Sequence, residues 1–359
     1  MRRPNRLSKL WSLAPILISS KSGTPTYRRP DALRRCLRSL QRQSWANWIC
    51  DVYDDDPAAS AREVVANMAD GRFRWTQNSP QKFAAGNIDQ CFSRINPQNA
   101  DWFCILEDDN VLMPEFIAAN MRVAREHNVR IVLRNQFAEY AHGTANASIS
   151  DGGLQDARIT AGVYQPSLLR LALIARGVVS NGGLFWSSHA ESNLELGIGG
   201  DAGLQEFLRG LAIEEPLYVA MEPLATWAVN GAGSLRDLGT VPKPSLVVSK
   251  VLRDVRRQVW SAATLADRQA FSSDDYFLFS PREKELGLIS SGLSGGPKML
   301  SSAERVIESA RACFVSVFGQ PDREVGLFLQ RCLASQKRRD AEAERYSQST
   351  SRMTTPPVK

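Results

Sequence analysis

The sequence lacks any apolar run that approaches the roughly 20 residues of a membrane-spanning helix. Its basic start, MRRPNRLSKLWSLAPILISS, is similar to a secretory signal, but Pro15 breaks the apolar run and no small-residue cleavage pattern follows. We therefore expect a cytoplasmic protein without a signal peptide. At most, it would attach to the inner face of a membrane through a basic amphipathic helix.

Cysteine and histidine are scarce as well. The chain has three histidines and six cysteines, and the cysteines form no CxxC pair and no Cys/His spacing suited to zinc. Several cysteines lie inside apolar periodic runs, so we expect buried, reduced thiols. The six are Cys36, Cys50, Cys91, Cys104, Cys313 and Cys332.

Charge is only moderately unbalanced. Forty-four Lys and Arg residues against 38 Asp and Glu residues give a formal net charge of +6. This excess favours an anionic partner, but no DNA- or RNA-reading motif is found, so we expect no nucleic-acid partner. The hydrophobic fraction of 43% is ordinary for a globular protein with a sizeable core.

Strand-like and helix-like segments alternate over the first third of the chain. This order predicts an α/β fold with a mostly parallel, Rossmann-like sheet and helices on both faces. The expected strands are 15–19, 48–53, 72–77, 102–106 and 129–134. The expected helices between them are 30–43, 60–69, 83–95 and 114–127.

The rest of the chain is less regular. After a polar loop or hairpin near 137–153, we expect helices at 166–176 and 200–212 and strand-like segments at 178–189 and 216–229. The pattern beyond residue 243 is helical and basic. We divide the chain into a basic segment (1–13), an α/β domain (14–242), a helical extension (243–335) and a disordered polar tail (336–359).

Two of the expected strands end in acid clusters, at residues 54–56 and 107–109. Clustered carboxylates repel one another unless a cation or hydrogen-bond donors offset their charge. A single cluster could be a solvated turn whose Asp caps the next helix. Two clusters at equivalent strand ends favour a binding site, because ligands of such sheets bind beyond the carboxyl ends of the strands.

Six segments follow one another in a characteristic order: PTYRRPDALRRCLRSLQRQS, DVYDDDPAA, QKFAAGNIDQCF, ILEDDNVLMPEFI, GGDAGLQEFLRGL and EPLATWAVNGAGS. Together they resemble the inverting family 2 glycosyltransferases, which have the GT-A fold. The resemblance spans Pro15 to Arg236. It implies an enzyme that moves a sugar from a nucleotide-diphospho-sugar to a hydroxyl acceptor, such as a saccharide, in polysaccharide or glycoconjugate synthesis.

The same resemblance implies a metal site. Asp109 would bind a divalent metal, Mn or Mg, which neutralises the charge that grows on the leaving diphosphate. Asp108 would contact the ribose or support the metal, whereas Glu107 is expected to be a solvated neighbour. Many relatives carry a histidine where this sequence has Asn230, so the third metal ligand stays open.

A nucleotide site is implied beside the metal. Tyr27 would pack against the base, with uracil favoured, and Asp55 would accept a hydrogen bond from its ring edge. Lys82 would face the ring or the diphosphate, and Asn87 matches the same family motif. The nearby arginines, including Arg29 and Arg35, are interpreted as a solvated helix face rather than a phosphate clamp.

Inversion needs a base that takes the proton of the acceptor hydroxyl. The resemblance assigns this role to Asp201, although a carboxylate at this position could also be a helix N-cap. Gly200 stands where relatives usually have Glu. Trp186 and His189 are candidates for acceptor binding, although a lone histidine in a loop is more often simply exposed.

Two other functions stay open. A non-catalytic nucleotide-sugar binding subunit of a polysaccharide-assembly complex would explain the departures at Gly200 and Asn230. A nucleotidyltransferase of similar fold would need a glycine-rich phosphate loop after the first strand, and the segment SSKSGTPTYRR has a single glycine. The sugar, the acceptor and the oligomeric state are not indicated by the sequence.

Overall fold

The computed structural model describes residues 19–176, 179–229, 246–273, 275–290, 299–319 and 322–353. The predicted basic segment 1–13 and the candidate ligand Asn230 lie outside these residues.

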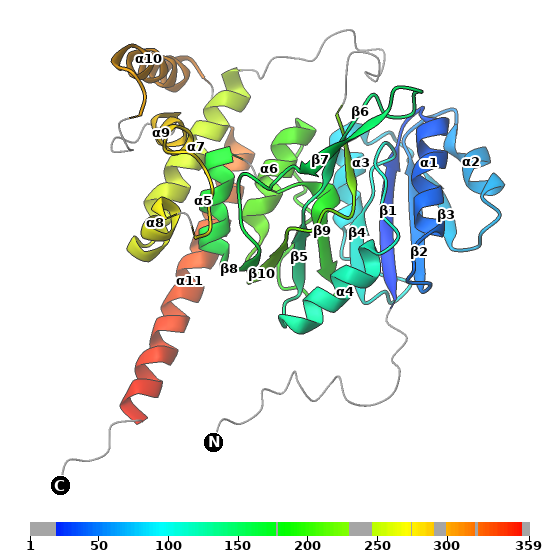
Figure 1. The fold of residues 1–359 in the computed structure, drawn as a ribbon, viewed down its shortest axis with the longest axis horizontal. Helices are drawn as coiled ribbons and strands as arrows, with labels where there is room; N and C mark the ends of the chain where they lie inside the picture. The colour runs from blue at the N-terminus through cyan, green and yellow to red at the C-terminus, as the bar shows by residue number, and fades with distance from the viewer. Residues whose placement is uncertain are drawn as a thin grey trace.

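The central sheet has eight strands in the order β3-β2-β1-β4-β9-β5-β10-β8 (Figure 1). β9 and β8 run antiparallel to their neighbours, and the other six strands are parallel to one another. The predicted α/β fold with a mostly parallel sheet is therefore confirmed. The strands are β1 (Ser20–Thr26), β2 (Trp48–Asp54), β3 (Phe73–Gln77), β4 (Trp102–Ile105), β5 (Ile131–Arg134), β8 (Gly162–Tyr164), β9 (Leu184–Ser187) and β10 (Leu217–Ala220).

The first strand differs from the expectation. It begins at Ser20, after the apolar run 15–19, and its sequence SKSGTPT consists of small residues and one lysine, all of them buried. β1 lies between β2 and β4, with Ser20 paired to Trp48 on one side and Trp102 on the other. Gly23 is required here, because a Cβ at this position would lie 2.7 Å from the Cβ of Cys91.

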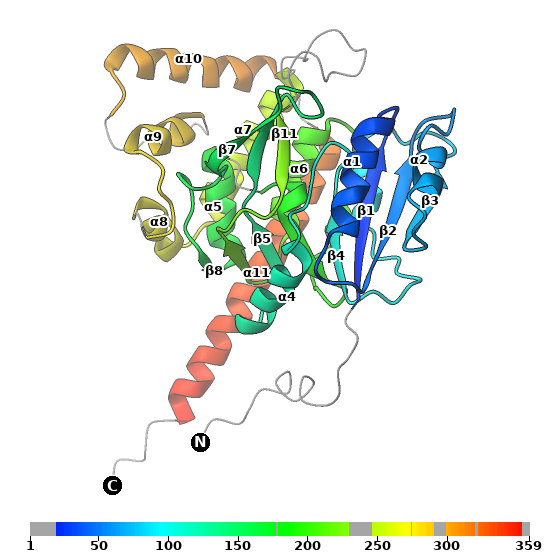
Figure 2. The ribbon, with the colours of Figure 1, turned by 45° about the vertical axis from the view of Figure 1, so that its right-hand side comes forward.

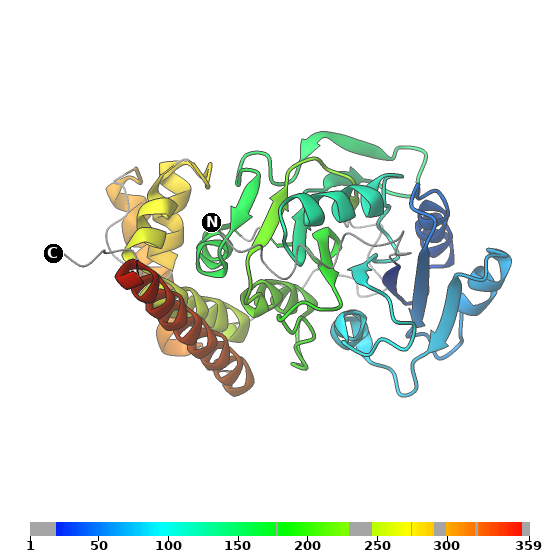
Figure 3. The same cartoon turned by 90° about the horizontal axis from the view of Figure 1, so that it is seen from below.

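Helices cover both faces of the sheet, as the turned views show (Figures 2 and 3). On one face, α1 (Pro30–Gln41), α2 (Ala61–Asn67) and α4 (Phe116–Glu126) bury a cluster that includes Leu33, Leu37 and Phe116. The other face is covered by α3 (Phe83–Asp89), the short 3-10 turn η2 (Gln90–Phe92), α5 (Pro166–Arg176) and α6 (Ala202–Ala212). Helical spacing in the sequence accounts for these faces, since Leu33, Leu37 and Leu40 recur on one side of α1.

A second, three-stranded sheet has the order β11-β6-β7. It comprises β6 (Phe137–Tyr140), β7 (Ser148–Gly153) and β11 (Thr226–Val229). The polar segment near 137–153 is therefore a hairpin, one of the two predicted alternatives. The Thr226 side chain accepts a hydrogen bond from the Val111 backbone, and Ala228 N donates to Asn110 Oδ1. These contacts bring the small sheet to the carboxyl end of β4.

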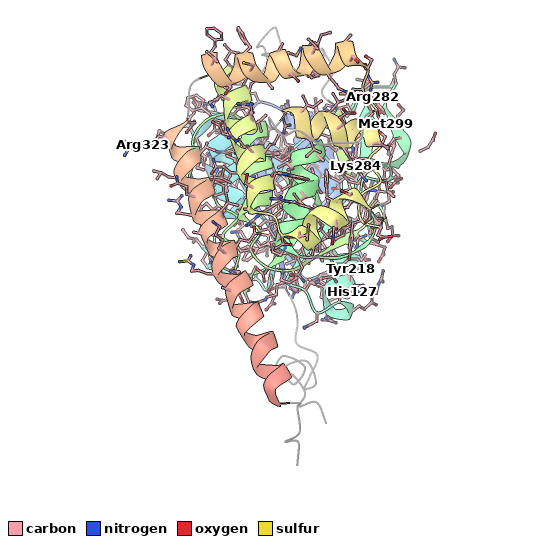
Figure 4. The ribbon with its side chains drawn as sticks, turned by 90° about the vertical axis from the view of Figure 1, so that its left-hand side faces the viewer. His127, Tyr218, Arg282, Lys284, Met299 and Arg323 are labelled. Atoms are coloured by element: carbon pink, nitrogen blue, oxygen red, sulfur yellow. The ribbon has the colours of Figure 1, made fainter. Side chains whose placement is uncertain are left out.

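The C-terminal part is helical, as predicted. Its helices are α7 (Leu246–Ala262), α8 (Leu265–Ser272), α9 (Pro281–Ser290), α10 (Ser302–Phe318) and α11 (Arg323–Met353). α5 contacts α7, α8 and α9, and α10 packs on α7 and α9 (Figure 4). In that view Arg282, Lys284 and Met299 lie close together near α9.

The end of the chain differs from the sequence prediction. α11 runs past Gln336 to Met353, where a disordered tail is expected. The segment QKRRDAEAER is polar but consists largely of strong helix formers, so intrinsic propensity favours the helix. Within the described residues, no helix is long and apolar enough to cross a membrane.

Candidate active site

Both acid clusters lie along one edge of the sheet. β1 lies between β2 and β4, and all three strands run parallel, so their carboxyl ends are side by side. Asp54 ends β2, and residues 107–109 follow β4 after Leu106. The opposite edge is marked by His127, whose ring stacks on Tyr218 with centroids 3.8 Å apart (Figure 4).

Hydrogen bonds from the backbone largely occupy the cluster 54–56. Asp54 accepts from Ala61 N at the start of α2, at 3.0 Å, and from the indole nitrogen of Trp75, at 3.1 Å. Asp56 accepts from Ala58 N, at 3.1 Å, and pairs with Arg28. These two carboxylates therefore fix the turn between β2 and α2, as the capping alternative anticipates.

Asp55 fixes the start of α3. One oxygen accepts from Lys82 N, at 2.7 Å, and from the Asn78 amide, at 2.9 Å, and the other accepts from Phe83 N, at 2.8 Å. Phe83 has a positive φ of 58°, a strained conformation for an aromatic residue, and these bonds hold it. An ionised carboxylate has about four acceptor positions, so Asp55 retains the capacity for one more donor.

Asn87 lies beneath this edge rather than on its surface. Its side-chain nitrogen donates to the backbone oxygens of Thr26 and Tyr53, at 3.3 and 3.2 Å. Its oxygen accepts from Asn78 and Gln90, at 3.0 and 2.6 Å. All four hydrogen-bonding positions are used, so in this structure Asn87 ties the ends of β1 and β2 together and has none left for a ligand.

The cluster 107–109 faces a guanidinium group. Nη1 of Arg29 lies 2.6 Å from Asp109 Oδ2 and 3.3 Å from Asp108 Oδ1. The other Asp108 oxygen accepts from Thr26 Oγ1, at 2.7 Å. Partial burial opposes the charge of Arg29, but the two carboxylates outweigh it and raise the pKa of Arg29. A positive charge therefore already lies between Asp108 and Asp109.

A divalent cation fits this pair in its chemistry, because carboxylate oxygens are the ligands that Mn²⁺ and Mg²⁺ prefer. The guanidinium marks the place where the fold itself neutralises both carboxylates. Within the residues that the structure describes, no three His, Cys, Asp or Glu side chains could together hold a metal ion. Asp108 and Asp109 would thus supply part of a coordination shell, and diphosphate oxygens would have to supply more.

Glu107 is not the solvated neighbour that the sequence suggests. Burial, the nearby Glu206 of α6 and Asp109 raise its pKa to about 8, although a hydrogen bond with the Asn181 side chain opposes the shift. Burial also raises the pKa of Glu206, whose carboxylate accepts from Asn181 N at 2.7 Å. Two carboxyl groups are thus enclosed where α6 approaches the end of β4.

Asp201 is the N-cap of α6. Its Oδ1 accepts from Leu204 N, at 2.9 Å, and its side chain is exposed. Gly200 before it has a φ of +115°, a conformation that side-chain-bearing residues rarely adopt. The glycine at this position, where relatives usually have Glu, therefore matches the local backbone.

A buried ion pair joins α3 to α6. Arg209, fully buried on α6, donates to Asp89 at 2.7 Å and to the Asn181 side chain at 2.6 Å. Asp89 also accepts from the backbone nitrogens of Leu196 and Gly197, at 2.9 and 2.8 Å. The loop that leads to Asp201 is thereby fastened to the helix that begins beside Asp55.

A pocket of about 480 Å³ opens between that loop and α3. Lys82 and Phe83 line one side, and Gly199 and Gly200 line the other. Phe83 is 71% exposed and offers its ring to solvent. The pocket therefore connects the start of α3 with the residue that precedes Asp201.

The other predicted site residues are distributed unevenly. Tyr27 lies at the end of β1 with the Arg28 guanidinium over its ring, 5.0 Å from the centroid. Lys82 is exposed and donates to Gln90, at 2.6 Å. Trp186, in contrast, is buried and stacks on Phe92, and His189 follows β9 at the opposite edge of the sheet. The structure does not bring these last two together with Asp201.

Arg29 and Arg35 are the residues that sequence reasoning missed. Arg35 pairs with Glu139 of β6 and donates to the backbone oxygen of Asp109. Both arginines face the site. The interpretation as a solvated helix face would require them to face solvent instead. The arginine-rich segment was visible in the sequence, but which of its members turn inward depends on where α1 meets β4.

Comparison with known proteins finds one family match and several similar solved structures. The family model described as glycosyl transferase family 2 matches residues 23–160. No curated protein sequence matches the chain. Among solved structures, the chain is similar to S. aureus TarS residues 1–349, at 12% identity and a TM-score of 0.47 over 89% of this chain and 88% of that one. The same fragment in complex with UDP-GlcNAc matches at 12% identity, a TM-score of 0.44 and the same coverage.

The mostly parallel sheet with helices on both faces is an α/β architecture of the GT-A type. The matched segment, residues 23–160, belongs to glycosyl transferase family 2, which confirms the resemblance found in the sequence.

Proposed function

We propose that this protein transfers a sugar from a nucleotide-diphospho-sugar, with uridine as the base, to a hydroxyl acceptor with inversion. The observation that carries the proposal is that both acid clusters lie at one edge of the sheet, at the carboxyl ends of β2 and β4 on either side of β1, within the family 2 segment. A further support is the pocket that leads from Lys82 to the residue before Asp201.

The donor would lie across the ends of β1, β2 and β4. Asp55 has capacity for one donor from a base edge, and Tyr27 presents a ring beside it. Asp108 and Asp109 would hold a divalent metal, Mn or Mg, which when bound would neutralise charge on the diphosphate. Lys82, whose side chain is exposed, is free to turn toward the phosphates from its contact with Gln90.

The acceptor would approach Asp201 from the pocket beside Gly200. Asp201 is exposed and ionised carboxylates are suitable proton acceptors, so it would take the acceptor proton as the hydroxyl oxygen attacks the sugar. Glu107 and Glu206 are enclosed between the end of β4 and α6, so they are less accessible alternatives to Asp201 as the base. Inward-facing Trp186 has no place in this scheme, and the exposed ring of Phe83 suits a sugar better.

Calorimetric titration of UDP tests the donor site. We expect UDP to bind with Mn²⁺, to bind at least tenfold more weakly with EDTA, and to lose the metal effect in Asp109→Ala, because one carboxylate cannot hold the cation. Asp31→Ala removes an exposed carboxylate from α1 and should leave both affinities unchanged. Metal-independent UDP binding that survives Asp109→Ala would contradict the metal site.

Titrations with GDP and dTDP in the same series test the base. UDP release from UDP-sugars, measured with and without saccharide acceptors, then separates an enzyme from a binding subunit. Tight donor binding without release in any of these assays would favour the non-catalytic alternative.

A further inference from the structure

A guanidinium nitrogen already occupies the position between Asp108 and Asp109 where a metal would bind. Nη1 of Arg29 contacts Asp109 at 2.6 Å and Asp108 at 3.3 Å, bridging the two carboxylates as a small cation would. Both carboxylates are buried, with 6% and 3% of their residue surfaces exposed, so few water molecules can share their charge. A divalent cation and this guanidinium cannot both lie between them.

The backbone of Arg29 is fixed where α1 begins, and its side chain reaches from there to the two carboxylates. Its carbonyl oxygen accepts from Leu33 N at 2.9 Å as α1 begins, and Pro30 follows it. The side chain is long, retains 17% of its exposure and does not cap the helix. The start of α1 therefore does not depend on a cap hydrogen bond from the guanidinium.

The two other arginines beside the site already have carboxylate partners. Arg35 already pairs with Glu139 and with the Asp109 carbonyl, and Arg28 already pairs with Asp56. A nucleoside diphosphate would bring two to three negative charges to this edge. Guanidinium groups bind phosphate oxygens in a fork that matches their geometry.

We propose that Arg29 is an internal counter-ion that competes with the divalent metal for Asp108 and Asp109 and passes to the diphosphate when metal and nucleotide bind together. This inference rests on the proposed donor site. If Arg29 competes in this way, metal binds weakly in the nucleotide-free protein. Metal and nucleotide binding are then coupled, because the metal replaces Arg29 at the carboxylates and the diphosphate replaces the carboxylates at Arg29.

The test is a titration of the full-length protein with Mn²⁺. Binding is measured as the loss of the electron paramagnetic resonance signal of the free ion. Without nucleotide, Arg29→Gln should bind Mn²⁺ at least tenfold more tightly than the parent, because the competing charge is gone. With saturating Mn²⁺, the same variant should bind UDP at least tenfold more weakly, because the diphosphate loses a partner. Arg34→Gln, an exposed arginine five residues along that pairs with Asp31, is the matched control and should change neither value.

Opposite changes in the two affinities are the signature of exchange. An unchanged or weaker Mn²⁺ affinity in Arg29→Gln would overturn the inference, since a purely structural arginine lowers both affinities on removal. If the variant is less stable in EDTA, the rise in melting temperature on adding Mn²⁺ gives a second measure, and it should exceed that of the parent. Parent protein that binds UDP with Mn²⁺ while the variant shows no exchange would retain the proposed function and reject this inference alone.

Discussion

Asp201 shows how one residue can have a structural and a chemical role. Its Oδ1 accepts from Leu204 N at 2.9 Å and so caps α6, while the residue itself is exposed and directly follows Gly200, which lines the pocket. A cap needs an oxygen acceptor, which Asn provides nearly as well as Asp. A base needs a carboxylate that can take a proton, which Asn does not provide.

Asp201→Asn should therefore separate the two roles. We expect the free energy of unfolding to change by less than about 0.5 kcal/mol and UDP affinity to stay constant, because the cap persists. Sugar transfer should fall about 10²- to 10⁴-fold with the loss of the base. Thermal melting, calorimetry and UDP release measure the three quantities.

Asp201→Ala provides the comparison, because it removes the cap as well and should cost about 1 kcal/mol more. Transfer by Asp201→Asn at a near-parental rate would show that another group, such as the enclosed Glu206, takes the proton.

At the scale of elements, α6 is the part that links the two halves of the site. Its first turn presents Asp201, its second carries Glu206 against the end of β4, and its third buries Arg209 against Asp89 of α3. Moving α6 away from α3 would leave a buried charge without its partner, which is strongly destabilising. The position of α6 relative to α3 is thus fixed by charge as well as by the apolar face of Leu204, Leu208 and Leu211.

The docking of α6 should depend on pH through Glu206. Burial raises the pKa of its carboxyl above the ordinary 4.5, so the folded state holds a proton more tightly than the unfolded chain. The resulting stability is fully present below pH 4.5 and is lost as pH rises through the folded pKa. Glu206→Gln keeps an oxygen for Asn181 N but carries no charge, so its melting temperature should exceed that of the parent increasingly above pH 5.

Melting curves between pH 4.5 and 8.5, in EDTA, measure this difference. Each kcal/mol should shift the melting temperature by about 2–4 °C at most in a chain of this size. Glu63→Gln, on the exposed face of α2, is the control and should show no pH-dependent gain. A variant that loses stability at every pH would mean that the charged form of Glu206 is required by its neighbours.

At the scale of the whole molecule, the C-terminal helices share a core with the α/β part. One cluster of buried apolar side chains includes Leu169 of α5, Val255 of α7 and Leu329 of α11. Polar contacts cross the same boundary: Arg170 of α5 donates to Gln336, and Arg339 pairs with Glu214. The predicted division at residue 243 therefore marks a change in the sequence pattern, but the parts on either side of it share one hydrophobic core.

We expect the full chain to unfold in one thermal transition and a chain ending at residue 242 to be insoluble, because truncation exposes the outer face of α5 to water. Calorimetry and the yield of soluble protein measure the two outcomes. A chain ending at residue 353, which removes only residues outside the described structure, is the control. A soluble 1–242 fragment that binds UDP would show instead that the helical extension is a separate domain.

Much of the architecture could be predicted from the sequence. Alternating periodicity located β2 to β5, α1, α2, α4 and α5 within a few residues, because each has an apolar pattern of its own. β1 was displaced because its buried residues are small and polar, and its position is fixed by pairing with β2 and β4 rather than by hydrophobicity. The antiparallel direction of β9 likewise has no local signature, and this direction is what carries His189 to the opposite edge of the sheet.

The sequence by itself determined the fold class, the family of residues 23–160 and the position of two acid clusters at strand ends, since each depends on residues that are near one another in the chain. Only the tertiary structure decided which side chains those clusters meet. Arg29 between Asp108 and Asp109, Glu206 beside Glu107, and Arg209 on Asp89 are pairs separated by 79 to 120 positions. Their charges interact because the sheet order and the helix packing bring them within a few ångströms, and local periodicity carries no information about such distances.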